Sequence, residues 1–179
     1  MKKGFTLIET IVVIAVIGLT LPVLIGTIFI LIRQQTKIIR LSQVKREGDY
    51  VINLMENTIR NRAVTIYKLP VLDDANIVCK GEIVGSSWSN PYFLDEDKQF
   101  FSYKLNGITV ASDSANPADL TSSKTIVSNF SISCLRNSIY SPALIILSFD
   151  ICYSGGCTLT RPEELASMHY QTRIKLRNY

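Results

Sequence analysis

The chain lacks most of the residues and motifs that carry common catalytic chemistry. Its 179 residues include one histidine, His169, and none of its four cysteines forms a Cys-x-x-Cys pair. Zinc sites draw their ligands from clustered histidine and cysteine, so this content argues against such a site. Gly-x-Ser-x-Gly and phosphate-binding glycine loops are also absent from the sequence. We therefore expect a protein that is not an enzyme and that holds neither a cofactor nor a metal.

Charge is absent from a long stretch near the N-terminus. The 23 residues from Thr10 to Ile32 contain no acidic or basic side chain. At about 1.5 Å per residue, a helix of this length extends roughly 35 Å, which exceeds the bilayer core of about 30 Å. The stretch is too long for a secretory signal, and Arg33 follows it without an Ala-x-Ala-like cleavage site. These features predict a membrane-spanning helix over residues 5–32.

One carboxylate, Glu9, interrupts the apolar block close to its start. On insertion scales a carboxylate costs about 2.5–3.5 kcal/mol at the centre of a membrane helix, and less near the interface. The segment contains no lysine or arginine that could pair with Glu9. An ordinary signal anchor does not require a carboxylate at this position, so we expect Glu9 to have a function of its own.

The residues around Glu9 match a known pattern. The opening Met-Lys-Lys-Gly-Phe-Thr-Leu-Ile-Glu-Thr, together with the apolar run, resembles the leader junction of type IV pilins and of type II secretion pseudopilins. The resemblance covers about the first thirty residues. It implies that a prepilin peptidase cuts after Gly4, which makes residues 1–4 a leader peptide, and methylates Phe5. It also implies that Glu9 is the glutamate of that family.

Cleavage would supply the missing partner of Glu9. The new α-amine of Phe5 has a reference pKa of about 7.7–8.0 and is largely cationic at neutral pH. This amine could belong to the same chain, one helical turn away, or to a neighbouring subunit. If Glu9 paired with the amine of a neighbouring subunit, this charge pair would fix the register between the two subunits.

The helix is expected to continue well beyond the apolar block. Apolar residues recur there at spacings of three and four, namely Leu41, Val44, Val51, Met55 and Ile59. No proline occurs between Pro22 and Pro70, and Gly48 is the only weak point. The pattern predicts one helix from about Phe5 to Ala63, of which residues 33–63 are amphipathic. A kink or loosened turn is predicted within the apolar part, at Gly18, Pro22 and Gly26.

The net charge of +4 is unevenly placed along the chain. Residues 33–67 carry seven basic and three acidic side chains, whereas residues 68–179 carry ten basic and eleven acidic ones. We interpret the basic stretch as a solvated helix face and not as a surface for anionic lipid or DNA. DNA binding therefore has no support of its own.

Short alternating segments follow the helix and predict strands. They cover residues 77–84, 92–94, 99–105, 108–111, 124–135, 144–153 and 168–176. Asn106-Gly107 predicts a hairpin turn, and residues 113–123 predict a loop. Within 124–135 the inward set is expected to be Ile126, Phe130, Ile132 and Cys134, and the last strand is expected to expose a basic face. Strands without intervening helices pair antiparallel. We thus predict an α+β fold, a long N-terminal helix packed on an antiparallel sheet in a head of residues 64–179, which the family resemblance also implies.

All four cysteines lie in the head. An even number of cysteines on one side of a membrane helix predicts disulfides in an oxidising compartment. Four cysteines allow three pairings. Tyr-Ser-Gly-Gly between Cys152 and Cys157 permits a tight reversal that brings these two together, which leaves Cys79 to pair with Cys134.

The remaining polar motifs have ordinary interpretations. The acidic groups Asp73-Asp74, Asp95-Glu96-Asp97 and Glu163-Glu164 are expected in solvated loops and not at a calcium site. Asn129-Phe130-Ser131 fits the glycosylation pattern but falls within a predicted strand. His169 is expected to be structural or simply exposed.

The sequence is compatible with three classes of function. The leading one is a structural subunit of a type IV filament or a related secretion or DNA-uptake machine. A faint resemblance of residues 54–63 to minor subunits favours a minor one over a major pilin. Its partners would be the prepilin peptidase, other subunits through the N-terminal helix, an inner-membrane assembly platform and the lipid bilayer. The protein would cross the inner membrane once, with the head outside the cytoplasm, and would join a surface or periplasmic filament. The alternatives are an anchored ligand-binding ectodomain and, less favoured, an anchored enzyme.

Overall fold

The computed structural model describes residues 6–79, 83–88, 91–113, 117–136, 141–155, 157 and 165–176, with the backbone alone at 83–88. Gly4, Phe5 and the pair Glu163-Glu164 lie outside these residues. The chain divides into two compact units, Met1–Ile39 and Arg40–Tyr179. The first unit contains the beginning of helix α1, and the second contains the rest of that helix and all of the described strands.

Helix α1 spans Leu7–Arg62, close to the predicted bounds. Its first part is apolar, and its threonine hydroxyls donate to backbone carbonyls one turn earlier, from Thr10 to Leu7, Thr20 to Ile17, Thr27 to Leu24 and Thr36 to Ile32. These bonds give each hydroxyl a partner within the helix. In an environment without water, the hydroxyls would need such internal partners. The helix runs without interruption through Gly18, Pro22 and Gly26, so a kink at these residues stays a prediction.

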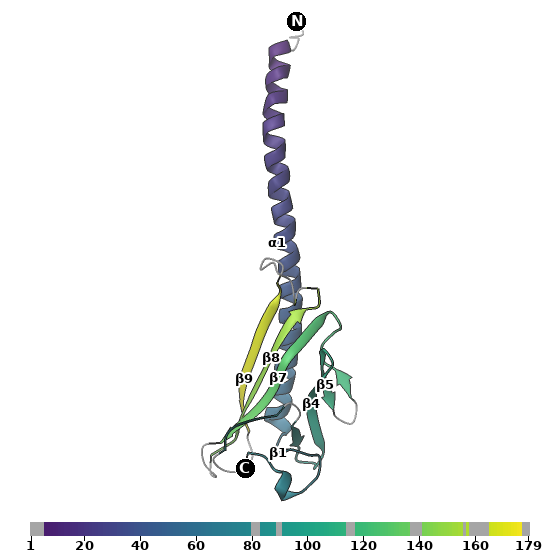
Figure 1. The fold of residues 1–179 in the computed structure, drawn as a ribbon, viewed down its shortest axis with the longest axis vertical. Coiled ribbons are helices and arrows are strands. Elements are labelled where there is room, and N and C mark those ends of the chain that lie inside the picture. The colour runs from purple at the N-terminus through teal and green to yellow at the C-terminus, as the bar shows by residue number, and fades with distance from the viewer. Residues whose placement is uncertain are drawn as a thin grey trace. The chain divides into compact units, whose positions relative to one another are not determined.

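Nine strands follow α1 in the described residues, and they form two antiparallel sheets. They are β1 (Thr65–Tyr67), β2 (Ile83–Trp88), β3 (Tyr92–Leu94), β4 (Phe100–Asn106), β5 (Thr109–Asp113), β6 (Ala118–Asp119), β7 (Thr125–Arg136), β8 (Leu144–Tyr153) and β9 (Ser167–Lys175), with the 3-10 helix η1 (Asp74–Asn76) after β1. One sheet has the order β1-β3-β4-β5-β6 and the other β2-β7-β8-β9. Figure 1 shows β7, β8 and β9 side by side. The predicted α+β layout is confirmed, with two sheets where one was expected.

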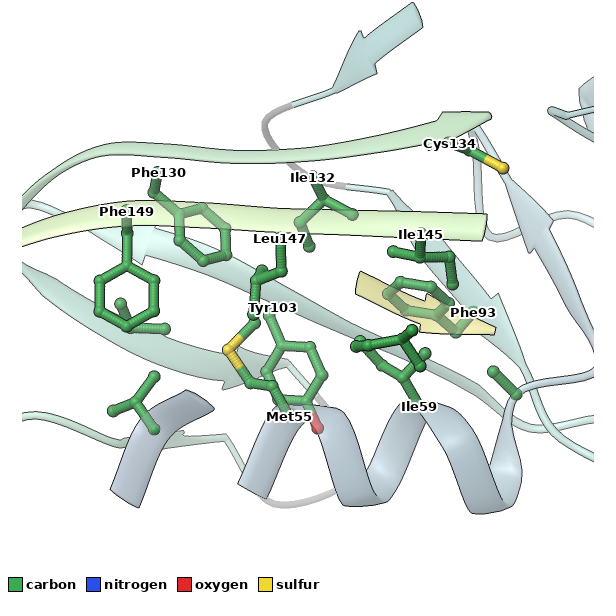
Figure 2. Packing of buried hydrophobic residues seen from close by; sticks show 14 of the residues in the cluster. Met55, Ile59, Phe93, Tyr103, Phe130, Ile132, Cys134, Ile145, Leu147 and Phe149 are labelled. Atoms are coloured by element: carbon green, nitrogen blue, oxygen red, sulfur yellow. The ribbon is translucent and has the colours of Figure 1, made fainter. Parts of the chain in front are cut away.

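The apolar stripe of α1 forms the floor of the core. Val44, Val51, Met55 and Ile59 are fully buried, as the spacing predicts. Figure 2 shows Met55 and Ile59 projecting from α1 toward the sheets, into a cluster that includes Phe93, Tyr103, Ile145 and Leu147. Burial of each such side chain contributes about 1.5–3 kcal/mol relative to exposure. The cluster draws on both sheets, so the helix holds them together.

A β-bulge in β7 changes which side chains face the core. The pairing register with β8 shifts between Ser128 and Ser131, and Asn129 has a φ of +52°. Val127 is buried before the bulge, and Phe130, Ile132 and Cys134 are buried after it. The prediction that Ile126 belongs to the inward set was wrong, because a bulge adds one residue and shifts the alternation.

The segment before β2 also differs from the prediction. Ile77 forms only an isolated bridge with Tyr67, and the strand itself begins at Ile83. Cys79, between them, has a φ of +68°, which is incompatible with an extended strand. Strands β1 and β6 were not predicted, and β6 lies within the segment that was expected to be a loop. Two or three residues are too few to show an alternating pattern.

The β4–β5 hairpin lies where the Asn-Gly pair predicts it. Asn106 pairs with Thr109, so Gly107 and Ile108 form the two-residue turn. Gly107 has a φ of +63°, the conformation that a type II′ turn requires at its first position.

Both disulfides join the pairs that the sequence analysis favours. Cys79 is bonded to Cys134 and Cys152 to Cys157, with Cα–Cα distances of 6.0 and 5.4 Å. The first connects the two sheets, since Val78, next to Cys79, donates to the carbonyl of Ile66 in β1, whereas Cys134 lies in β7. The second closes a short loop after β8. The strand partner of Cys152 is Ser167, so the expected hairpin beginning at Cys157 is displaced along the chain.

The two disulfides should differ in their effect on stability. We expect non-reducing peptide maps to show only these two pairs, and a peptide joining Cys79 to Cys152 would contradict the pairing. In the chain-entropy description, closing 55 residues contributes about 4 kcal/mol and closing five contributes about 2 kcal/mol to the free energy of unfolding. Denaturant unfolding of the full chain in detergent, with serine replacing one pair at a time, measures both values. Equal losses would contradict the expected dependence of the stabilisation on loop length.

Glu47 of α1 bonds the helix to the segment that enters β7. Its carboxylate accepts hydrogen bonds from the backbone N–H and hydroxyl of Ser122, at 3.1 and 2.7 Å, and from the hydroxyl of Thr125, at 2.6 Å. The side-chain amide of Gln43 donates a further bond at 3.3 Å. Partial burial raises the pKa of Glu47, but these hydrogen bonds together outweigh burial and hold the pKa below its ordinary value of 4.5.

Glu47 should make stability depend on pH in the acidic range. Because its pKa is lower in the folded chain, the ionised carboxylate stabilises the fold above pH 4.5, and this contribution disappears as pH falls through the folded value. We expect the Tm difference between the parent and Glu47→Gln to be largest near pH 7 and to shrink between about pH 5 and pH 3. Asp113→Asn, which removes a half-exposed ion pair with Lys104, is the control and should show a small difference throughout. A Glu47→Gln difference that is constant with pH would contradict this role.

Candidate functional site

Glu9 lies in the first turn of α1 and reaches back to the residue before the helix. Its Oε2 accepts hydrogen bonds from the backbone N–H and the hydroxyl of Thr6, both at 3.4 Å. Thr-x-x-Glu at a helix start is the capping-box pattern, in which the glutamate satisfies a backbone N–H that has no partner within the helix. The carboxylate also lies at the positive end of the helix dipole. Glu9 thus has partners in the uncut chain, although residues 6–32 contain no cation.

Thr6 is the residue of this site that the sequence analysis missed. The spacing of threonine and glutamate was the signal that could have found it, because a capping box is recognisable from sequence alone. Phe5 is the neighbour of Thr6 in the chain, so an α-amine created after Gly4 would arise beside the capping box. The predicted processing residues themselves are outside the described part of the chain.

The part of α1 that follows Glu9 presents an apolar surface. Every side chain from Thr6 to Thr36 is exposed, and the large apolar residues from Leu7 to Ile32 are 45% exposed or more. By length and composition α1 suffices to cross a membrane. A continuous apolar surface of this extent marks contact with lipid or with other protein chains.

Comparison with known proteins identifies the N-terminal segment. Residues 1–21 match the family model of the prokaryotic N-terminal methylation motif. The chain carries the signature of type IV pilins and pseudopilins. No curated protein and no solved structure is significantly similar to the chain.

The methylation motif indicates how this segment is processed and used. It points to a structural subunit and not to an enzyme, and it implies processing by a prepilin peptidase and assembly with other pilin subunits. The motif and the apolar α1 together fit a membrane-anchored pilin. Gly4, Phe5 and Glu9 all fall within the matched residues, as does Thr6.

A second polar group belongs to the second unit and lies on the outer face of β8 and β9. Asp150 lies 2.6 Å from Nδ1 of His169 and accepts a hydrogen bond of 2.7 Å from the side chain of Asn129. The bonds from Asn129 and then His169 hold the pKa of Asp150 below its ordinary value. His169 is exposed, in agreement with one of its two expected environments, and Asn129 of the glycosylation pattern is exposed at the bulge. The group stabilises cross-strand pairing on an open sheet face.

The predicted acidic loops are used for local structure. Asp73 caps η1 by accepting a hydrogen bond from the N–H of Ala75. Asp95 accepts a bond from the N–H of Gln99 and pairs with Arg62 of α1. Asp95 is buried, so the expectation of a solvated loop was wrong at this residue. Among the described residues, no group of three or more His, Cys, Asp or Glu side chains is arranged to hold a metal ion.

Glu9→Gln separates the observed capping contact of the Glu9 side chain from its predicted role in assembly. Glutamine also serves in a capping box, so helix content and membrane insertion should match the parent. Glutamine has no charge to pair with an α-amine, and losing one member of a buried charge pair costs several kcal/mol. We therefore expect incorporation into filaments to fall by roughly tenfold or more. Quantitative immunoblots of sheared filaments and of membranes measure the two effects.

Glu9→Ala, which removes the cap as well, is the companion variant. It should also insert into the membrane but assemble poorly. Filament incorporation of Glu9→Gln at the level of the parent would show that the charge of Glu9 has no part in assembly.

Proposed function

We propose that the chain is a subunit of a type IV filament, or of a related secretion or DNA-uptake machine, cut after Gly4 and N-methylated on Phe5. The observation that carries this proposal is the methylation motif at residues 1–21, continuous with an exposed apolar helix. The capping box adds support, because it accommodates the Glu9 carboxylate before cleavage, when no amine is present. After cleavage the amine of Phe5 becomes the partner of Glu9, in the same chain or in a neighbouring one.

The proposed course of the protein follows from the same features. Residues 1–4 are the leader, residues 5–32 cross the inner membrane, residues 33–63 are the amphipathic continuation, and residues 64–179 form the head outside the cytoplasm. Two disulfides in the second unit favour an oxidising location for the head. Subunits then leave the bilayer with the help of an assembly platform and pack through their N-terminal helices.

Within this class we propose a minor subunit. The basis is the resemblance of residues 54–63 to the same helical region of minor pilins and pseudopilins. Abundance tests it directly, because sheared filaments in which this chain is the dominant band would make it a major pilin. A chain that is anchored and never processed would instead be a ligand-binding ectodomain.

Processing should depend on the absence of a side chain at residue 4. We expect Gly4→Leu to remain at precursor mass in the membrane, whereas the parent loses residues 1–4 and gains one methyl group when the peptidase is present. Gly26→Leu is the matched control, since a Cβ at Gly26 meets nothing within 4 Å. Intact-mass measurement distinguishes the products. Normal maturation of Gly4→Leu, or an uncut parent in cells that contain the peptidase, would overturn the proposed processing.

A further inference from the structure

The apolar stripe of α1 does not by itself fix where the helix sits along its axis. Val51, Met55 and Ile59 follow one another at spacings of four. A displacement of α1 by one turn would replace Val51 by Met55, and Met55 by Ile59, at the same places in the core. Apolar burial is not directional, so such a displacement exchanges one apolar side chain for another at modest cost.

Gly48 distinguishes the observed axial position from its neighbours. The ring of Tyr170 in β9 lies so close to α1 that a Cβ built on Gly48 would be 2.3 Å from its Cε2 atom. The residues one turn away on either side are Val44 and Ile52, both β-branched. Neither could occupy the place of Gly48 without driving Tyr170 away. Gly48, which the sequence marks as a weak point of the helix, is therefore the position at which the Tyr170 ring packs directly against the helix backbone.

Tyr170 is itself fixed by contacts with the sheet and the helix. Its ring stacks on Phe149, with centroids 5.3 Å apart and an interplanar angle of 15°. Its hydroxyl donates to Oδ1 of Asp49 at 2.9 Å and lies 3.1 Å from the carbonyl oxygen of Lys45. Partial burial, and then the carboxylate of Asp49, raise the pKa of Tyr170 to about 12, so the hydroxyl remains a donor at any physiological pH.

Two further carboxylates of α1 depend on the same axial position. Glu56 accepts a hydrogen bond of 3.1 Å from the hydroxyl of Thr172, also in β9, and pairs with Arg60 of its own helix. Glu47 accepts the bonds from Ser122 and Thr125 described above. A shift of one turn would place Gln43 or Val51 where Glu47 stands, and Ile52 or Arg60 where Glu56 stands. The carboxylates would then no longer face the hydroxyls of Thr125 and Thr172, and of the four replacements only Gln43 could offer an acceptor oxygen, so these hydrogen bonds would be weakened or lost.

We propose that Gly48 and the carboxylates Glu47, Asp49 and Glu56 form an axial lock that holds α1 in one register on the strands. The apolar stripe supplies the affinity between helix and sheets, and the lock removes the alternative positions that the stripe tolerates. The axial lock itself does not depend on the function of the protein. Its use, to stop the helix from sliding when a subunit is drawn along its helix axis, rests on the proposed function.

The lock is testable by distances from α1 to the two ends of β9. Tyr170 contacts α1 near Gly48 and Thr172 contacts Glu56, so β9 advances along α1 in the same direction as the helix. Spin labels on unnatural amino acids at Asn53 and Ser167, or at Asn53 and Lys175, occupy exposed positions and leave the native cysteines intact. Sliding by one turn, about 5.4 Å, lengthens one distance and shortens the other.

We expect the parent, as full chain in detergent, to give one distance for each pair. Glu47→Ala combined with Tyr170→Ala and Thr172→Val, which removes the ring seated against Gly48 as well as the hydrogen bonds, should add a second population, changed by up to about 5 Å and in opposite directions for the two pairs. Gly48→Ala should give the same change by displacing the ring. Val44→Ala is the control, since it destabilises the core through a buried cavity without touching the lock, and its distances should match the parent.

Parent-like single distances in the combined variant would overturn the proposal, as would a second population in Val44→Ala. If the combined variant does not fold, Gly48→Ala alone is measured by the same distances, and a single parent-like distance for each pair would then overturn the proposal. Cleavage after Gly4 is measured separately on each variant by intact mass. An unprocessed parent would therefore contradict the proposed function without contradicting the axial lock.

Discussion

Burial of one face of α1 against both sheets is the constraint on which the second unit depends. Neither sheet has a closed core of its own, because Phe93 and Tyr103 of one and Ile145 and Leu147 of the other meet in a single cluster that includes Met55 and Ile59. Removing the helix would expose the inner faces of both sheets at once. The chain therefore gives the helix two kinds of attachment, apolar side chains for affinity and hydrogen-bonded carboxylates for position.

The two parts of α1 differ in how their apolar side chains are distributed around the helix. From Leu7 to Ile32 the side chains are apolar on every face, which suits surroundings that are apolar all round. From Val44 to Ile59 only one stripe is apolar, because the opposite face meets water. Apart from threonines that bond within the helix, Glu9 is the exception in the first part, and the capping box shows how a carboxylate is accommodated there without a cation. The same residue type in the second part, at Glu47, is used to bind hydroxyls of the strands.

Much of this arrangement follows from local sequence patterns, and the rest depends on contacts between distant residues. The helix, the alternation of β8 and β9 and the pairing of Cys152 with Cys157 are written in short spacings that the sequence displays. The division into two sheets is not, because β1 pairs with β3 and skips β2. The bulge at Asn129 is invisible because the residues around it alternate acceptably in either register. Glu47 and Ser122 are 75 residues apart, and nothing local to either announces the other. At the candidate site, Glu9 can be recognised because a carboxylate in an apolar run has a high free-energy cost of membrane insertion. Thr6 can be recognised only through the capping-box pattern that it forms with Glu9.

The placement of the disulfides has a consequence for the order in which they can form. Cys152 and Cys157 are five positions apart and meet in an unfolded chain by closing a short loop, which is fast. Cys79 follows β1 without belonging to a strand, and Cys134 lies in β7, so these two come together only when distant parts of the chain have packed. If the local bridge forms first, the two remaining thiols have only each other, and the number of pairings falls from three to one. The short bridge thereby acts as a guide to oxidative folding, independent of what it adds to the stability of the finished protein.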